Sequence, residues 1–182
     1  MTTNSYQPGP LRHAEVTRSG DRWALVFTRD FPQPPAAVWA ALTDPDELRQ
    51  WAPYTADRPL TATGPVTLIA IDDGEEREMP GEITAADPPA LLEFTWDTDV
   101  LRWELTAAGD GTRLRLTHRL TDRATSPMVA AGWHVCLDVV ELLLAGTPVG
   151  PITGPAALEH GWAELSARYA EQLGFEPPDA PR

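Results

Sequence analysis

The side chains with the clearest capacity for chemistry in this sequence are its four histidines and its single cysteine. Alternation along residues 113–120 places His118 on the same side as Leu114 and Leu116, so the strand presents it to an apolar interior. A histidine there would anchor the polar group of a ligand or transfer a proton. The commoner arrangement is a buried histidine hydrogen-bonded to its neighbours, and the sequence leaves both open.

Cys136 lies within an apolar run, residues 126–145, one helical turn after Gly132. As a nucleophile it lacks a base, because His134 is only two residues away and points to another side of a helix. We interpret Cys136 as a small buried side chain that is able to line a cavity. Gly132 costs a helix about 1 kcal/mol relative to alanine, which indicates close approach by a packed element or a ligand.

The sequence predicts neither a metal site nor a cofactor. Its histidines, His13, His118, His134 and His160, show no paired-ligand spacing, and there is only one cysteine. The acidic run at 72–78 is typical of a solvated turn. Neither a glycine-rich phosphate loop nor a nucleophile elbow is present.

Length and charge narrow the classes of function. A chain of 182 residues is long enough for one sizeable core, which we expect over residues 11–174, with tails at 1–10 and 175–182. A formal net charge of -13 opposes binding to nucleic acid or to an anionic membrane. One cysteine, no recognisable signal peptide and no apolar run of about 20 residues predict a cytoplasmic protein without a membrane span.

The pattern predicts mostly short antiparallel strands. Residues 11–18 and 22–31 form a hairpin, and further strands follow at 66–71, 79–86, 91–96, 101–107 and 113–120. Their short connections favour antiparallel neighbours, and their alternation gives one apolar and one charged face. Two short helices after Pro34 interrupt the series, with Asp44 as the cap of the second, and 52–65 is predicted to be a loop.

The chain's most apolar segment is a predicted helix at 126–145. Its polar residues His134, Asp138 and Glu141 fall on one narrow strip, and apolar side chains cover the rest. Such a helix is too apolar for contact on one side only. We expect it to lie in a curved sheet, with a last helix at 155–173 packed on its flank.

Four segments in the order of a known family carry a resemblance. PPAAVWAALTDPDELRQW (34–51), PGEITAADPPALLEFTW (80–96), GDGTRLRLTHRL (109–120) and AGWHVCLDVVELLLAG (131–146) together span most of 22–146. They resemble signatures of the START-like (SRPBCC) superfamily, in its Hsp90-ATPase-activator-homologue branch. The resemblance implies an α+β helix-grip fold, with a curved antiparallel sheet wrapped around a long C-terminal helix and a cavity between them.

The resemblance also implies function. Members bind lipids, hormones or polyketides, and some are cyclases or dehydratases. We therefore expect a small hydrophobic or amphipathic ligand in the cavity. The expected ligand-binding residues are Trp39, Phe94, Trp96, Trp103, Leu116, His118, Met128, Gly132, Cys136 and Val140.

Several alternatives stay open. The tryptophans among these residues are equally well explained as ordinary core. A cyclase or dehydratase using His118 is one alternative function, and a protein-binding module for Hsp90 is another. The chain would be a monomer or a homodimer.

Overall fold

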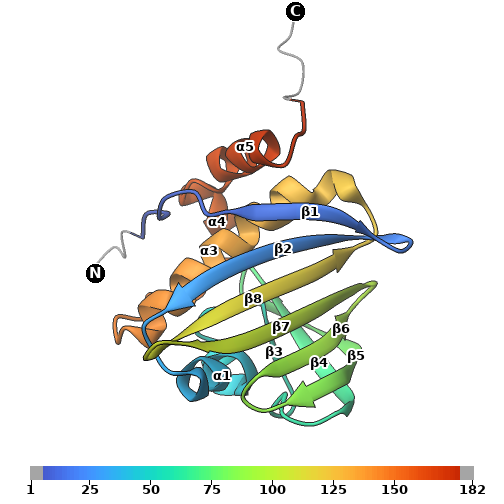
Figure 1. Cartoon of the computed structure of the whole chain (residues 1–182), viewed down its shortest axis with the longest axis vertical. Helices are drawn as coiled ribbons and strands as arrows, with labels where there is room; N and C mark the ends of the chain where they lie inside the picture. The colour runs from blue at the N-terminus through green and yellow to red at the C-terminus, as the bar shows by residue number, and fades with distance from the viewer. Residues whose placement is uncertain (1–5, 177–182) are drawn as a thin grey trace, which may run out of the picture.

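The computed structural model of the chain describes residues 6–176, in which one curved sheet bends around a long helix (Figure 1). Eight strands lie in the order β1-β2-β8-β7-β6-β5-β4-β3. Each strand is antiparallel to its neighbours. The predicted helix-grip fold is confirmed.

Most strands were predictable from alternation. The strands are β1 (Ala14–Ser19), β2 (Arg22–Phe31), β3 (Tyr54–Ala56), β4 (Gly64–Asp72), β5 (Glu75–Asp87), β6 (Leu91–Trp96), β7 (Asp99–Ala108) and β8 (Gly111–Leu120). β2 and β6 have the predicted bounds, whereas β4, β5, β7 and β8 extend beyond them. The prediction of a continuous loop at 52–65 is wrong, because β3 lies within it and pairs with β4.

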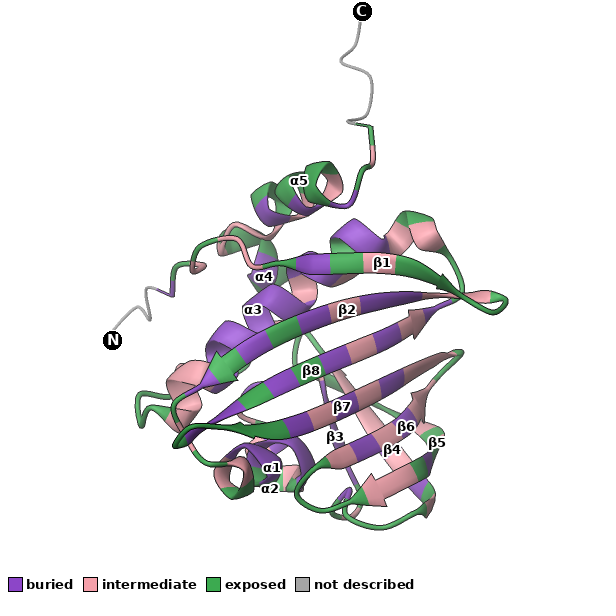
Figure 2. Cartoon of the chain, viewed as in Figure 1, coloured by how far each residue is buried: buried purple, intermediate pink, exposed green. Residues whose placement is uncertain are grey.

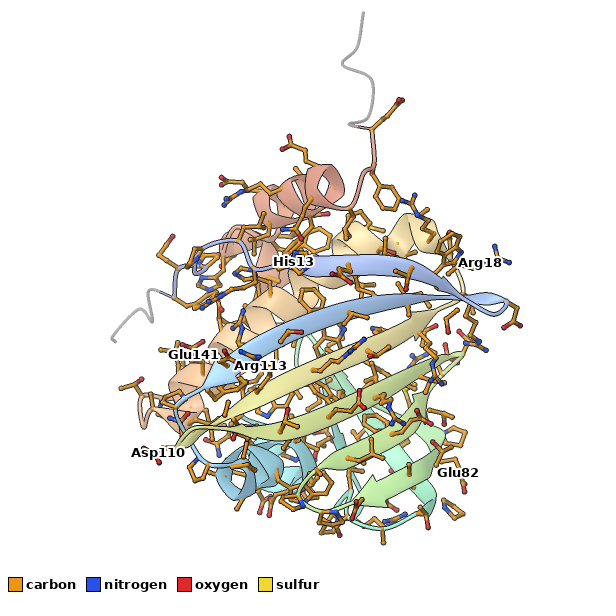
Figure 3. All side chains as sticks on the ribbon, in the orientation of Figure 1. His13, Arg18, Glu82, Asp110, Arg113 and Glu141 are labelled. Atoms are coloured by element: carbon orange, nitrogen blue, oxygen red, sulfur yellow. The ribbon has the colours of Figure 1, made fainter. Side chains whose placement is uncertain are left out.

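One face of the sheet is buried and the other is largely exposed. Figure 2 shows buried residues at alternate positions along β8, where Leu114, Leu116 and His118 face the interior. The outer face carries charged side chains, including Arg113 and Glu82, both labelled in Figure 3. A sheet covered on one side only has this distribution.

Two short helices follow β2, as predicted. They are α1 (Pro35–Thr43) and α2 (Pro45–Leu48). The carboxylate of Asp44 caps α2 by accepting hydrogen bonds from the backbone N–H groups of Asp46 and Glu47, at 2.8 and 3.3 Å. Leu42, Leu48 and Trp51 are fully or almost fully buried, so this pair of helices closes one end of the core.

The long helix is α3 (Ser126–Leu144), which follows the 3-10 turn η1 (Arg123–Thr125). By length and composition alone, residues 123–144 would suffice to cross a membrane, which differs from the sequence expectation. However, 61% of the most apolar window is buried inside the protein, and a buried core helix passes the same test. Even His134 and Asp138 of its polar strip are buried.

The last predicted helix is two helices. α4 (Pro155–Glu159) is capped by His160, and α5 (Trp162–Gln172) begins after Gly161. Gly161 has φ +80°, a left-handed conformation that breaks the helical path and that glycine adopts at little cost. α5 packs on α3, as the apolar stripe predicts, through the buried Leu165 and Tyr169.

The N-terminal segment differs from the expected tail. Residues 1–5 lie outside the described residues, but residues 6–10 are held against α3. Tyr6 is buried, and its hydroxyl donates a hydrogen bond to Asp138 Oδ2 at 2.8 Å. The backbone N–H of Gly9 donates to the same oxygen at 2.9 Å. Of the predicted tail at 175–182, only residues 175 and 176 are described.

Asp138 is the centre of a buried polar cluster. Arg29 of β2 donates to its Oδ1 at 2.6 Å, and His134 Nε2 lies 3.3 Å from its Oδ2. Burial alone would raise the pKa of Asp138. The His134 imidazole, the charge of Arg29 and the Gly9 amide outweigh burial and hold this pKa well below its ordinary range. The carboxylate is therefore an ionised and paired group in the core.

We expect Asp138→Ala to lower the free energy of unfolding by about 3–5 kcal/mol, because it leaves the buried Arg29 guanidinium without its main partner. Urea denaturation measures the loss. Asp30→Ala is the matched control, since it removes the exposed Asp30–Arg113 pair and should cost less than about 1 kcal/mol. Equal losses in the two variants would contradict the assignment.

The pH dependence of stability has a defined sign. A carboxyl group with a depressed pKa stabilises the fold above its unfolded pKa of about 4, and the stabilisation declines as pH falls below it. The stability difference between the wild type and Asp138→Asn should therefore be constant from pH 7 to 5 and shrink below pH 4. Urea titrations at each pH provide the measurement, and a difference that grew on acidification would contradict it.

Candidate functional site

A pocket of about 450 Å³ lies beside α3. One wall comes from α3, a second from Trp96 and His118 of the sheet, and the outer wall from residues 152–162. We call it the α3 pocket, and its lining residues are Pro53, Trp96, His118, Val129, Gly132, Trp133, Val135, Cys136, Ile152, Thr153, Gly154, Ala157, Leu158 and Trp162. The side chains are almost all apolar or aromatic.

Helical spacing brings the α3 residues to one side. Val129, Gly132, Trp133 and Cys136 follow one another at intervals of three, one and three residues, which places them on a single face. Trp162 Nε1 of α5 lies 4.0 Å from where a β-carbon of Gly132 would be, which is an ordinary van der Waals distance. A β-carbon would therefore fit, and the close approach expected at this glycine is not found; Trp162 is its neighbour at the edge of the pocket.

His118 is fixed through both ring nitrogens. Trp133 Nε1 donates a hydrogen bond to His118 Nδ1 at 2.9 Å, so the ring proton lies on Nε2. Nε2 lies 2.9 Å from Asp99 Oδ2, to which it donates. The imidazole also stacks on Trp96, at an interplanar angle of 17°. Neither nitrogen is left to act as a free acid or base in this arrangement.

Cys136 has the properties of an inert lining residue. The side chain is buried, and burial raises the pKa of its thiol to about 12. A thiol with this pKa is protonated near neutrality and is therefore a poor nucleophile. Among the described residues no hydrogen bond joins the thiol to a base, and His118, which lines the same pocket, is bonded to Trp133 and Asp99 instead.

Four of the ten residues expected to bind ligand line the α3 pocket, namely Trp96, His118, Gly132 and Cys136. Five others lie in the packed core instead: Trp39, Phe94, Trp103, Leu116 and Val140. The sixth, Met128, is 47% exposed on the surface. None of these six lines the pocket.

Aromatic packing explains why the central gap is filled. Trp103 meets Trp51 and Trp133 edge to face, with ring centroids 6.1 and 5.4 Å apart. Tyr54 makes similar contacts with Phe94 and Trp96. The free space therefore lies to one side of α3 rather than under its centre.

Sequence reasoning missed most of the outer wall. Residues 152–154 belong to a segment without periodicity, which gave no signal. The stripe that includes Leu158 and Trp162 did predict a helix packed against α3, and this signal could have identified both as lining residues. Trp133 follows Gly132 in an apolar run, and that pattern predicts burial without indicating a place in the pocket wall.

A second cavity, of about 760 Å³, lies between the N-terminal segment and the C-terminal half of α3. Its charged residues Arg12, Asp138 and Glu141 already pair within the protein. Across residues 6–176, no three histidine, cysteine or acidic side chains gather as a metal site would require. The α3 pocket is thus the better candidate site.

Comparisons with known proteins bear on the family and the fold. The profile of the family described as "Activator of Hsp90 ATPase homolog 1-like protein" matches residues 32–145. A search of curated proteins found no match.

Solved structures share the fold. CalU16 from Micromonospora echinospora is 21% identical, with a TM-score of 0.65 over 88% of this chain and 96% of that one. A conserved protein of unknown function from Enterococcus faecalis, EF2215, is 21% identical, with a TM-score of 0.64 over 90% and 92%. The protein encoded by BPP1335 of Bordetella parapertussis is 21% identical, with a TM-score of 0.63 over 98% and 100%.

At this identity the structures establish the fold alone, while the profile covers more than half of the chain. The chain therefore belongs to the Activator of Hsp90 ATPase homolog 1-like family, whose helix-grip proteins are typically ligand-binding or cyclase-like.

Proposed function

We propose that the protein binds a small hydrophobic or amphipathic molecule in the α3 pocket. The observation that carries the proposal is an apolar, aromatic-lined space of about 450 Å³ next to the grip helix. Pockets for small molecules in proteins measure about 300–1,000 Å³ and have mainly hydrophobic linings with few polar groups.

The rim of the pocket supports access for such a ligand. Leu158 of α4 is 58% exposed and lines the pocket, so part of the apolar wall faces water. A ligand that covered Leu158 and Val129 would remove this apolar surface from water and gain the corresponding free energy.

The hydrogen bonds of His118 favour binding over catalysis. A proton-transferring histidine needs one ring nitrogen directed at the substrate, but Trp133 and Asp99 occupy both. Cys136 adds no nucleophile at its raised pKa. A cyclase or dehydratase role for His118 therefore has less support than ligand binding.

A chaperone-binding role has less support too. The large hydrophobic side chains that are exposed within residues 6–176 are Met128 and Leu158, and docking on another protein usually requires a larger apolar patch. The single cysteine, which is free and buried, is in keeping with a reducing compartment such as the cytoplasm.

The uncharged fluorophore N-phenyl-1-naphthylamine tests the proposal. We expect a saturable rise in its fluorescence with the wild-type protein. Gly132→Leu should weaken binding at least about tenfold, because the added side chain occupies the space that the ligand requires. Ala167→Leu, at an exposed position of α5, is the matched control and should bind like the wild type.

Circular dichroism of both variants establishes that they are folded. Unsaturable fluorescence with the wild type, or unchanged affinity in a folded Gly132→Leu variant, would contradict binding in the α3 pocket.

Cys136 provides an independent readout, since it is the only cysteine of the chain. We expect N-ethylmaleimide to label it far more slowly than glutathione, because its pKa of about 12 leaves little thiolate. The rate should rise about tenfold per pH unit between pH 7 and 9, and saturating N-phenyl-1-naphthylamine should lower it. Mass spectrometry measures labelling, with Cys136→Ala as the control.

Labelling as fast as that of glutathione would contradict the burial of Cys136. A rate unaffected by the bound fluorophore would place the ligand elsewhere.

A further inference from the structure

We infer that the α3 pocket selects uncharged ligands and discriminates against anions such as carboxylates and sulfonates. The inference rests on the proposed function and adds the chemical class of the ligand. It follows from what the pocket wall lacks and from the acidic groups that lie next to it.

The pocket wall contains no cationic side chain. None of the residues that line it is an arginine, and the sequence contains no lysine at all. Arg29, the most deeply buried arginine, donates to Asp138 at 2.6 Å and lies 3.6 Å from Glu141. Asp138 and Cys136 are two positions apart on α3, so this arginine meets the opposite side of the helix from the pocket.

The pocket also offers an anion few hydrogen-bond donors. Nε2 of His118 already donates to Asp99, and Nε1 of Trp133 already donates to His118. The indole N–H of Trp162 makes no hydrogen bond within residues 6–176, and it lies at the edge of the pocket over Gly132. The side-chain hydroxyl of Thr153, which also lines the pocket, is a second neutral donor. Two neutral donors do not replace the hydration shell that an anion loses on entering.

Carboxylates stand close to the pocket on two sides. Asp99 lies behind His118, and its side chain is 25% exposed. At the rim, Asp72 Oδ1 contacts Gly154 so closely that a β-carbon there would not fit. An anionic ligand would be repelled from both sides, and the net charge of -13 adds to the repulsion at low ionic strength.

The aromatic wall suits a flat, neutral molecule. Trp96, Trp133 and His118 already pack stacked or edge to face, with centroid separations of 6.0–6.3 Å. The parts of these rings that line the pocket give a ligand apolar contact without requiring a charge. The selectivity therefore has two causes. The pocket makes favourable contacts with an aromatic ligand, and it provides no positively charged partner for an anion.

Two fluorophores that share one ring system test the inference. N-phenyl-1-naphthylamine is uncharged, and 8-anilinonaphthalene-1-sulfonate carries an additional sulfonate. We expect the wild-type protein to bind the uncharged probe at least about tenfold more tightly. Titration of each probe with the full chain gives the two dissociation constants.

Because the uncharged probe is also the more hydrophobic of the two, a pair of variants isolates the charge effect. Leu158→Arg places a cation on the exposed rim of the pocket, and Leu158→Gln is the uncharged control at the same position. The preference for the uncharged probe should fall about fivefold or more in Leu158→Arg relative to Leu158→Gln. The difference between the variants should diminish as salt is added.

The outcomes separate the two proposals. Equal affinity of the wild type for both probes, with both lost in Gly132→Leu, would overturn the inference and leave the proposed function standing. An unchanged preference in Leu158→Arg would also overturn it. If the uncharged probe fails to bind the wild type, the proposed function fails and the inference fails with it.

Discussion

The buried pair of Arg29 and Asp138 is the interaction on which the arrangement of α3 depends. A charge in the core must be paired, so α3 can present Asp138 only toward β2 and the N-terminal segment. At about 100° per residue, Val129 and Cys136 then lie roughly opposite, on the far side of the helix. The polar contact therefore orients the apolar face that becomes the wall of the pocket.

The same cluster holds the outer wall in place. His134 Nδ1 is 2.7 Å from the hydroxyl of Tyr169 on α5, and His160, at the end of α4, lies 3.1 Å from the backbone oxygen of Tyr6. Both contacts connect the C-terminal helices to groups that also bind Asp138. Trp162 completes the attachment by packing near Gly132. Core electrostatics and pocket shape are thus linked through a few hydrogen bonds.

Sequence alone predicted the fold in detail where a pattern was strong. Alternation located β2 and β6, and the continuous apolar run located α3. β3 was missed because three residues in a proline-rich segment are too few to show periodicity; the strand forms through its pairing with β4.

For the site, alternation correctly predicted that His118 faces the interior. Alternation assigns a residue to a face of the sheet, but it does not say where along that face a pocket lies. Phe94 and Trp96 share a face, yet only Trp96 reaches the pocket, because long-range contacts between α3 and 152–162 decide where space remains.

The family profile ends at residue 145, whereas six of the lining residues lie between 152 and 162. Within that stretch only Ile152 and Ala157 belong to the buried hydrophobic core. Substitutions there can reshape the pocket while leaving the packing between the sheet and the grip helix unchanged. A domain built this way can change the shape of its pocket during evolution at little cost to its core.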